Sequence, residues 1–226
     1  LSDYDHVRDF ASGVVRPDGL DLTVLTLQVE EIFFRFLKYR EFDASEVSMA
    51  KYASLVSQGN CDLVGIPVFP SRIHRHSSIY VRTDGPVQTP QDLVGRRVGL
   101  PEWAQTAAVY SRGFLSHQYG LDLTSIEWVQ AGVDQPGRGE KVALVLLGGI
   151  RIERRPDTSL NAMLLSGEVD AVLSAHPPSS IEKGLPGVKR LIADFLTVEQ
   201  DYFRSTRVFP IMHTVVMRRD LYDQNP

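Results

Sequence analysis

The chain has 226 residues, a net charge of -4 and an apolar share of 43%, which suit a globular protein of one large or two small domains. No apolar run reaches membrane-spanning length, and the acidic balance argues against a general nucleic-acid binder. The single cysteine, Cys61, excludes an internal disulfide framework. It fits a reducing compartment, so we expect a cytoplasmic protein, although a periplasmic protein with one cysteine would look the same. No signal peptide is recognisable, but the chain starts at Leu1 and stops where a helical pattern begins, so we expect a longer polypeptide.

Strand and helix signals alternate along the first third of the chain. The β-branched run DLTVLTL predicts a strand over residues 21–27, and CDLVGIPVF predicts a buried strand over 61–69. Residues 48–59 predict a helix with Ser48 as its N-cap. Residues 29–42 predict a helix with four large apolar side chains on one face: Ile32, Phe33, Phe36 and Leu37.

The alternation continues to the end of the chain. The expected helices are 89–95, 103–120, 159–167 and 199–206, and the expected strands are 96–100, 125–131, 168–175 and 211–220. The Gly-rich stretch over 131–141 predicts a surface loop. Strands separated by helices predict an α/β protein with largely parallel sheets.

Ligands of open α/β sheets bind at the carboxyl ends of strands, near the N-termini of helices. This rule marks six candidate segments: residues 2–5, 30–31, 46–48, 69–76, 101–106 and 174–178. In the fifth of them, a strand runs into Pro101 and a helix follows. The free amides at the start of that helix could hold a carboxylate.

The most unusual stretch is VFPSRIHRHSSIYVRT, residues 68–83, which gathers positive charge in an acidic chain. If residues 72–80 are extended, Arg72, His74 and His76 share one face, because side chains of a strand alternate. That face could bind a dianion. A solvated edge strand, whose charges discourage aggregation, explains the pattern equally well.

Six segments of the chain resemble the 4,5-dihydroxyphthalate decarboxylase family, in order and over almost the whole length. They are SDYDHVRDF, VEEIFFRFLKYREFDASEVSMAKY, IPVFPSRIHRHSSIYVRTD, DLVGRRVGLPEWAQTAAVYSRGFL, SGEVDAVLSA and FPIMHTVVMRRDLY. The combination of FPSR…RHSSIYV with FPIMHTVVMRRDL is specific, whereas GEVDA is shared widely with solute-binding proteins.

The resemblance implies a two-lobed fold like that of type 2 periplasmic binding proteins, with two crossover strands and the ligand between the lobes. Lobe one would comprise residues 1–80 with 210–226 returning to it, and lobe two would comprise 81–209. The segments SSIYVRTD and IMHTVVMRRD would be the crossovers, so the basic stretch would face the cleft. The family continues well past a position like Pro226, so we expect that the C-terminal part of lobe one is absent from this chain.

The resemblance also implies a reaction, the loss of one carboxylate of 4,5-dihydroxyphthalate as CO2 without oxidation, giving protocatechuate in phthalate degradation. Cations must hold the dianion, and an acid must protonate the ring carbon that loses CO2. Arg72 is the expected carboxylate clamp, because a guanidinium fork matches a carboxylate. His74 or His76 is the expected proton donor, although either could be a simple surface histidine.

Further candidates surround this core set, each with a structural alternative. His213 is a third candidate catalyst, but a histidine in the apolar run PIMHTVV is more often a core residue. Glu102 either favours the helix dipole or accepts a catechol hydroxyl. The other expected substrate-binding residues could equally be caps, turns or surface charges: Tyr4, Glu31, Ser48, Ser71, Gln105, Thr106 and His176.

The sequence gives little support for a metal or a cofactor. His74-x-His76 could chelate an ion, but spacing identifies no third ligand. The chain has no phosphate loop and no dinucleotide fingerprint, since Gly132, Gly137 and Gly139 lack the needed spacing. We therefore expect no cofactor and no metal, with a small aromatic carboxylate as partner and neither nucleic acid nor membrane. A homo-oligomer is left open.

Two other functions compete with the decarboxylase. A solute-binding protein for an aromatic or other small carboxylate would use the same cleft without chemistry. Two histidines beside an arginine favour the enzyme, because a binder needs cations but no proton donor. A pyrimidine-precursor or thiamin-precursor protein of related fold is the third hypothesis, and the lysine or histidine donor context that it would need is not found.

Overall fold

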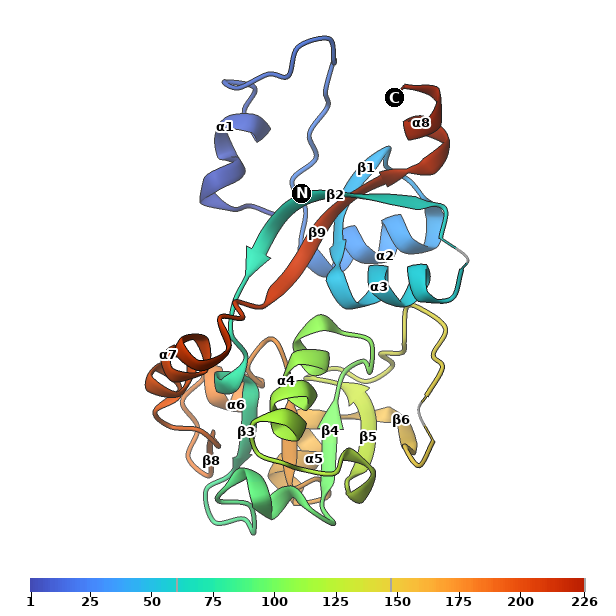
Figure 1. Ribbon diagram of the computed structural model, residues 1–226. Helices are drawn as coiled ribbons and strands as arrows, with labels where there is room; N and C mark the ends of the chain where they lie inside the picture. Colours follow the sequence, from blue (N-terminus) through green and yellow to red (C-terminus); the bar gives the residue numbers. More distant parts are fainter. Residues whose placement is uncertain (60, 147, 226) are drawn as a thin grey trace. The chain divides into compact units, whose positions relative to one another are not determined.

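The computed structural model describes residues 1–59, 61–146 and 148–225 (Figure 1). The chain divides into two compact units: unit 1 comprises Leu1–Arg72 and Ile211–Pro226, and unit 2 comprises Ile73–Pro210. Each unit has its own sheet, of three strands in unit 1 and six in unit 2. Among the helices described, none is long and apolar enough to cross a lipid bilayer.

Unit 1 is a three-stranded antiparallel sheet in the order β1-β9-β2. Its elements are η1 (Asp5–Val7), α1 (Arg8–Ala11), α2 (Val29–Tyr39), β1 (Ala44–Ser48), α3 (Met49–Ser57), β2 (Leu63–Arg72), β9 (Ile211–Arg218) and α8 (Arg219–Gln224). The central strand, β9, comes from the far end of the chain. The expectation of largely parallel sheets is therefore wrong for unit 1, because β9 lies between β1 and β2 and runs antiparallel to both of them.

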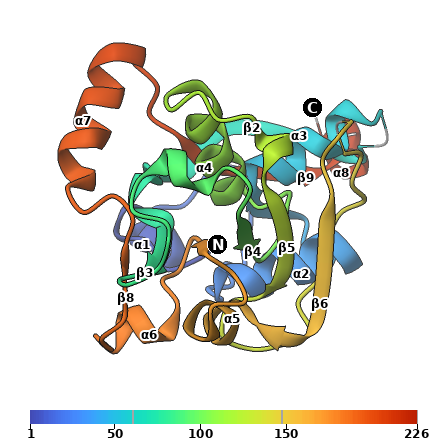
Figure 2. The ribbon, with the colours of Figure 1, turned by 90° about the horizontal axis from the view of Figure 1, so that it is seen from below.

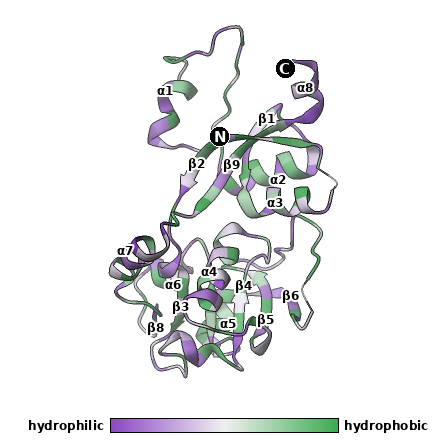
Figure 3. Ribbon diagram, viewed as in Figure 1, coloured by the Kyte–Doolittle hydropathy of each residue, from purple (hydrophilic) through white to green (hydrophobic). Residues whose placement is uncertain are grey.

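The core of unit 1 joins α2 and α3 to one face of this sheet. Phe36 of α2 is fully buried and packs with Val47 of β1, Leu63 of β2 and Val216 of β9, and side chains of α3 join the cluster. The predicted apolar face of α2 is confirmed, since Ile32, Phe33 and Phe36 are buried and Leu37 packs against the core. Figure 3 shows α8, which has no buried residue, in mostly hydrophilic colours.

The strand expected over residues 21–27 does not form. This run is mostly exposed and pairs with no other strand of the described chain, and β-branched residues alone cannot supply the hydrogen-bonded neighbour that a strand requires.

Unit 2 is a mixed sheet in the order β6-β5-β4-β7-β3-β8. Its elements are η2 (His76–Ser78), β3 (Ile79–Arg82), η3 (Pro90–Leu93), β4 (Arg97–Leu100), α4 (Thr106–His117), η4 (Leu123–Ser125), β5 (Glu127–Gly132), β6 (Ile152–Ser159), α5 (Leu160–Ser166), β7 (Ala171–Leu173), α6 (Ser179–Glu182), β8 (Val188–Arg190) and α7 (Phe195–Thr206). The pairs β4–β5, β4–β7 and β5–β6 are parallel, whereas β3 pairs antiparallel with β7 and β8.

Helices cover both faces of the sheet of unit 2, with α4 on one side and α5 on the other (Figure 2). Alternate residues of β3 accordingly belong to different cores. Ile79 packs in the cluster that contains Phe114 of α4, and Tyr80 packs in the cluster that contains Leu160 of α5. Unit 2 is therefore a three-layer α/β sandwich whose inner strands, β3, β4, β5 and β7, are buried on both faces.

Candidate functional site

A histidine occupies the middle of the sheet of unit 1. His213 lies on the central strand β9, directly opposite Ser48 of β1 and Ser71 of β2. The exposure pattern of β9 alternates, so His213 points to the face opposite that of the core residue Val216. Its side chain is 14% exposed, and the ring of Phe33 contacts it edge-on at a centroid distance of 4.9 Å.

A fully buried carboxylate accompanies this histidine. Oε2 of Glu46 lies 3.1 Å from Nδ1 of His213 and accepts a hydrogen bond of 2.9 Å from the hydroxyl of Tyr4. Oε1 accepts a hydrogen bond from the backbone N–H of Ser2. Burial alone would raise the pKa of Glu46, but the contacts with His213, Ser2 and Tyr4 together lower it. Glu46 is thus a buried anion held by three donors.

The arrangement orients the imidazole. Because Oε2 of Glu46 is an acceptor, the tautomer that the contact favours carries its proton on Nδ1 of His213. Nε2 has no hydrogen-bond partner among the residues that the structure describes. The hydroxyl of Tyr4 lies 3.1 Å from the same Nδ1, and burial together with the charge of Glu46 raises the pKa of Tyr4. A carboxylate on one nitrogen and an open second nitrogen form an arrangement that can move a proton at Nε2.

Unit 1 brings together four of the residues expected from the sequence: Tyr4, Ser48, Ser71 and His213. Sequence reasoning does not name Glu46 as a site residue, although segment 46–48 is one of the six candidate segments and adjoins the N-terminus of the helix expected over 48–59. Its signal was an acidic residue in the strand-like run ASEVS, where charge is unexpected. Glu31 does not join the cluster, because it lies in the first turn of α2 and pairs with Arg35 at 2.9 Å.

The basic stretch is not extended throughout, which corrects the expected alternation. Arg72 is exposed and ends β2 in unit 1, whereas His74 and His76 belong to unit 2. Residues 76–78 form a 3-10 helix, which changes the direction of successive side chains. His74 and His76 remain near each other, with ring centroids 6.3 Å apart.

His76 is enclosed by neighbours. Its ring is 1% exposed and stacks on Phe114 of α4 at 4.0 Å, while Nε2 lies 2.9 Å from Oε1 of Gln118. Nδ1 is 4.0 Å from Glu199 of α7. Burial lowers the pKa of His76, with the hydrogen bond to Gln118 acting in the opposite direction. His76 therefore joins α4 and α7 to the basic stretch, and its burial favours the uncharged ring.

His74 is less enclosed than its neighbour. It is half-buried, stacks on Phe209 at 5.1 Å and meets Tyr202 edge-on at 6.0 Å. Burial lowers its pKa as well. An aromatic setting of this kind favours the uncharged ring.

The start of α4 and the segment before it carry three more of the expected residues: Glu102, Gln105 and Thr106. The helix starts at Thr106 and not at residue 103, so Glu102 lies ahead of it and does not open it. Glu102 is fully buried, and its Oε1 accepts hydrogen bonds from Arg138 at 2.6 Å and Lys141 at 3.1 Å. Gln105 is the N-cap residue but makes no side-chain capping bond, and Thr106 is buried.

The last expected residue, His176, is exposed just past β7. It makes no hydrogen bond or ion pair with any residue that the structure describes. The described residues include no group of three His, Cys, Asp or Glu side chains that could hold a metal ion.

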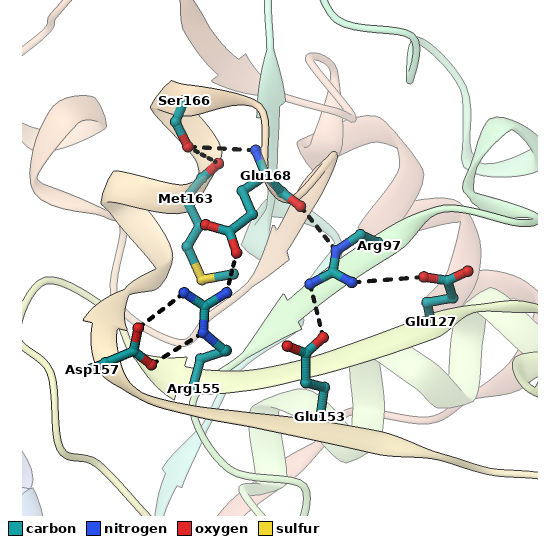
Figure 4. Close-up of polar contacts among 8 residues, drawn as sticks. All are labelled: Arg97, Glu127, Glu153, Arg155, Asp157, Met163, Ser166 and Glu168. Carbon is teal, nitrogen blue, oxygen red and sulfur yellow. Dashed lines mark hydrogen bonds and ion pairs between the residues drawn. The ribbon is translucent and has the colours of Figure 1, made fainter.

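A second group of charges lies on unit 2, where the end of α5 meets β4 and β6 (Figure 4). Arg97 reaches Glu153 at 2.9 Å and Glu127 at 3.8 Å, while Arg155 pairs with Asp157 at 3.0 Å and with Glu168. Every member of this network is at least one-quarter exposed and has a partner of opposite sign. We interpret it as a surface network that ties α5 to the sheet.

Comparison with known proteins identifies the family. The chain is 37% identical over 227 residues to a 4,5-dihydroxyphthalate decarboxylase of Comamonas testosteroni, covering 100% of this chain and 69% of the relative. It is 37% identical over 206 residues to a protein of the same name from Pseudomonas putida, covering 91% and 80%. The chain belongs to the 4,5-dihydroxyphthalate decarboxylase family. Residues 70–139 also match the family model described as NMT1/THI5 like.

Solved structures show the fold. The ligand-binding component of an ABC-type import system from Staphylococcus aureus matches with a TM-score of 0.50 and 12% identity, covering 96% of this chain and 62% of that one. The desulfurization enzyme DSZB matches with a TM-score of 0.50 and 18% identity, covering 97% and 66%. The chain therefore spans less than two thirds of each of these two proteins. The binding-protein-like fold is confirmed, and because one neighbour is a transport component and the other an enzyme, fold alone does not decide the activity.

Proposed function

We propose that this protein is a carboxy-lyase that converts 4,5-dihydroxyphthalate into protocatechuate and CO2 without oxidation. The observation that carries the proposal is the 37% identity, over the whole chain, to a relative named for this decarboxylation. The cluster of His213, Glu46 and Tyr4 supports it, because the reaction needs a positioned proton donor and a solute-binding protein does not.

The chemistry requires one proton for each CO2 released. The bond between the ring and one carboxylate breaks, its electron pair stays on the ring carbon, and CO2 leaves. In the proposed mechanism, Nε2 of protonated His213 delivers a proton to that carbon, while Glu46 offsets the charge of the imidazolium. Solvent then returns the proton to His213. The catechol hydroxyl para to the departing carboxylate assists by donating electron density into the ring.

The roles expected from the basic stretch are revised in part. Arg72 remains the proposed carboxylate clamp, since it is an exposed guanidinium at the end of β2. His213 takes the proton-donor role in place of His74 and His76. Burial lowers the pKa of both these rings, and His76 is 1% exposed, which suits a neutral positioning residue better than a proton donor.

The experiment is a single assay with two readouts. The protein is mixed with 4,5-dihydroxyphthalate carrying ¹³C-labelled carboxyls, and labelled CO2 and protocatechuate are quantified with and without a chelator. We expect the two products in equal amounts. We expect His213→Gln to reduce kcat by about 10²- to 10⁴-fold with a smaller change in KM, because a positioned general acid contributes a factor of that size.

The matched control is His117→Gln, which changes an exposed histidine on α4 and should leave kcat near the normal value. Tight binding of 4,5-dihydroxyphthalate without any CO2 would favour the alternative, a solute-binding protein. Normal turnover by His213→Gln would return the proton-donor role to His74 or His76.

A further inference from the structure

The side-chain carboxylate of Glu140 binds the turn that precedes α4. The backbone N–H groups of Trp103 and Ala104 both donate to the side chain of Glu140, the first to Oε1 and the second to Oε2 at 3.4 Å. Glu140 comes from the connection between β5 and β6, which forms no helix or strand over residues 133–146 and 148–151. Two successive backbone amides thus donate to one carboxylate, and that carboxylate belongs to a segment without regular secondary structure.

A buried guanidinium stands beside this turn. Arg112 of α4 is 6% exposed and lies over the ring of Trp103, with its central carbon 3.5 Å from the ring centroid. Its Nη2 donates to the carbonyl oxygen of Trp103 at 2.9 Å. Its Nη1 is buried and has no hydrogen-bond partner among the residues described. An unsatisfied buried donor is costly, so an open guanidinium N–H next to a carboxylate-binding turn points to an anionic ligand.

Electrostatics agree with this geometry. Burial lowers the pKa of Arg112 to about 9, and the nearby charge of Glu140 opposes that shift. The group holds three cations, Arg112, Arg138 and Lys141, against two carboxylates, Glu102 and Glu140. The net charge of this group is therefore +1, and it becomes +2 when the Glu140 side chain moves away. That excess matches an aromatic dicarboxylate, which carries two negative charges.

We propose that the amides of Trp103 and Ala104, together with Arg112, form a subsite for one carboxylate of a dicarboxylate ligand, and that Glu140 is an internal occupant which the ligand displaces. The nature of the ligand rests on the proposed function. The subsite itself rests on contacts within unit 2. Glu140 then sets affinity and selectivity, because a ligand must compete with a carboxylate that is already attached to the chain.

The probe is phthalate, which offers two adjacent carboxylates without the catechol hydroxyls, and its binding is measured by calorimetry. Glu140→Gln removes the charge of the occupant while keeping its size. We expect this variant to bind phthalate about threefold to tenfold more tightly than the unmodified protein, because the fraction of open subsites rises. Benzoate should gain less, since one carboxylate cannot match two excess cations. Glu127→Gln, at an exposed position of unit 2, should change neither affinity.

Arg112 gives the second arm. In the Glu140→Gln background, Arg112→Gln should weaken phthalate binding at least tenfold, and Arg112→Lys should restore part of it. Far-ultraviolet circular dichroism checks that each variant keeps its fold. If Glu140→Gln weakens binding or leaves it unchanged, or if phthalate binds to neither protein, Glu140 is a structural cap and the proposal is wrong.

The outcomes separate this proposal from the proposed function. Tighter phthalate binding by Glu140→Gln without CO2 release from 4,5-dihydroxyphthalate would retain the subsite and reject the decarboxylase. Normal decarboxylation with weaker phthalate binding by Glu140→Gln would retain the decarboxylase and reject the subsite.

Discussion

Glu46 illustrates how a single buried charge is stabilised in this protein. Its carboxylate is fully buried, yet it faces an imidazole, a phenol hydroxyl and a backbone amide. A buried carboxylate without such partners would be protonated instead. The side chains of Tyr4 and His213 therefore keep Glu46 ionised, and Glu46 in turn fixes the orientation of both side chains.

This coupling makes the stability of unit 1 sensitive to acid. The pKa of Glu46 in the folded protein is lowered from 4.5, so its contribution is fully present above about pH 4.5 and is lost as the pH falls through the lowered value. We expect Glu46→Gln to destabilise unit 1 by about 1–3 kcal/mol at pH 7, because a charged acceptor of buried donors is lost. The difference from the unmodified protein should shrink as the pH falls below 4.5.

Hydrogen exchange of the β9 amides between pH 7 and pH 3.5 checks this prediction, after correction for the intrinsic exchange rate. Glu31→Gln is the control within the same unit, since the Glu31 side chain is 48% exposed in a surface ion pair and should change stability by less than about 1 kcal/mol. A constant difference between Glu46→Gln and the unmodified protein across that range would contradict the lowered pKa.

The rule that ligands bind at the carboxyl ends of strands, near helix N-termini, identified several residues of the candidate site from the sequence. It marked Tyr4, Ser48 and Ser71, and the resemblance added His213, and all four meet in unit 1. Their roles stay predictions. The sequence could not show that His76 is enclosed by Phe114 and other side chains, because that burial depends on packing between α4, α7 and η2.

At the scale of elements, periodicity predicted most helices and the buried strands, but it missed β1, β6 and β8. β6 is an edge strand with charged residues and Pro156, a composition that sequence rules assign to loops. β8 has three residues, too few for a pattern. β1 buries Ser45 and Glu46 together with Val47, so no apolar alternation is present. A local sequence pattern cannot show that distant parts of the chain will bury polar side chains such as these.

Packing of α5 on β4 requires a glycine. A Cβ added at Gly99 would lie 2.5 Å from Cδ2 of Leu160, the first residue of α5, which is fully buried. We expect Gly99→Ala to destabilise unit 2 by about 1–3 kcal/mol through overpacking, and Leu160→Ala alone by about 2–5 kcal/mol through a cavity. The double variant should cost less than the sum, because the shortened side chain at position 160 makes room for the new methyl group.

Denaturant unfolding of the single and double variants, followed by tryptophan fluorescence, measures this coupling. Gly113→Ala in α4 is the control, since a Cβ there would meet nothing within 4 Å. It should stabilise the protein slightly, because alanine favours a helix over glycine. Strict additivity at positions 99 and 160 would show that the sheet moves to accept the methyl group.

Of the two compact units, one is a single continuous segment of the chain and the other is built from two separate segments. Unit 2 is continuous from Ile73 to Pro210, with a six-stranded sheet and two hydrophobic cores. Unit 1 is discontinuous, and its central strand, β9, follows unit 2 in the chain. Sequence periodicity could identify β9 as a strand. It could not show that β9 separates β1 from β2, because strand order depends on contacts between distant segments.

Removal of every residue after Pro210 tests this division. We expect unit 2 to stay folded and unit 1 to lose its sheet, because β1 and β2 both pair with β9 and not with each other. The chain has two tryptophans, Trp103 and Trp128, which lie edge-to-face at 5.3 Å within unit 2. Their near-ultraviolet circular dichroism should therefore persist in the truncated chain. Hydrogen exchange of the β1 and β2 amides should rise to the rate of an unfolded segment, since a strand without a neighbour has no ladder hydrogen bonds to protect it.

The full chain is the control, and a second fragment limited to Ile73–Pro210 should give the same tryptophan signal. Slow exchange in β1 and β2 of the truncated chain, or loss of the tryptophan signal in either fragment, would contradict the division of the chain into these two folding units.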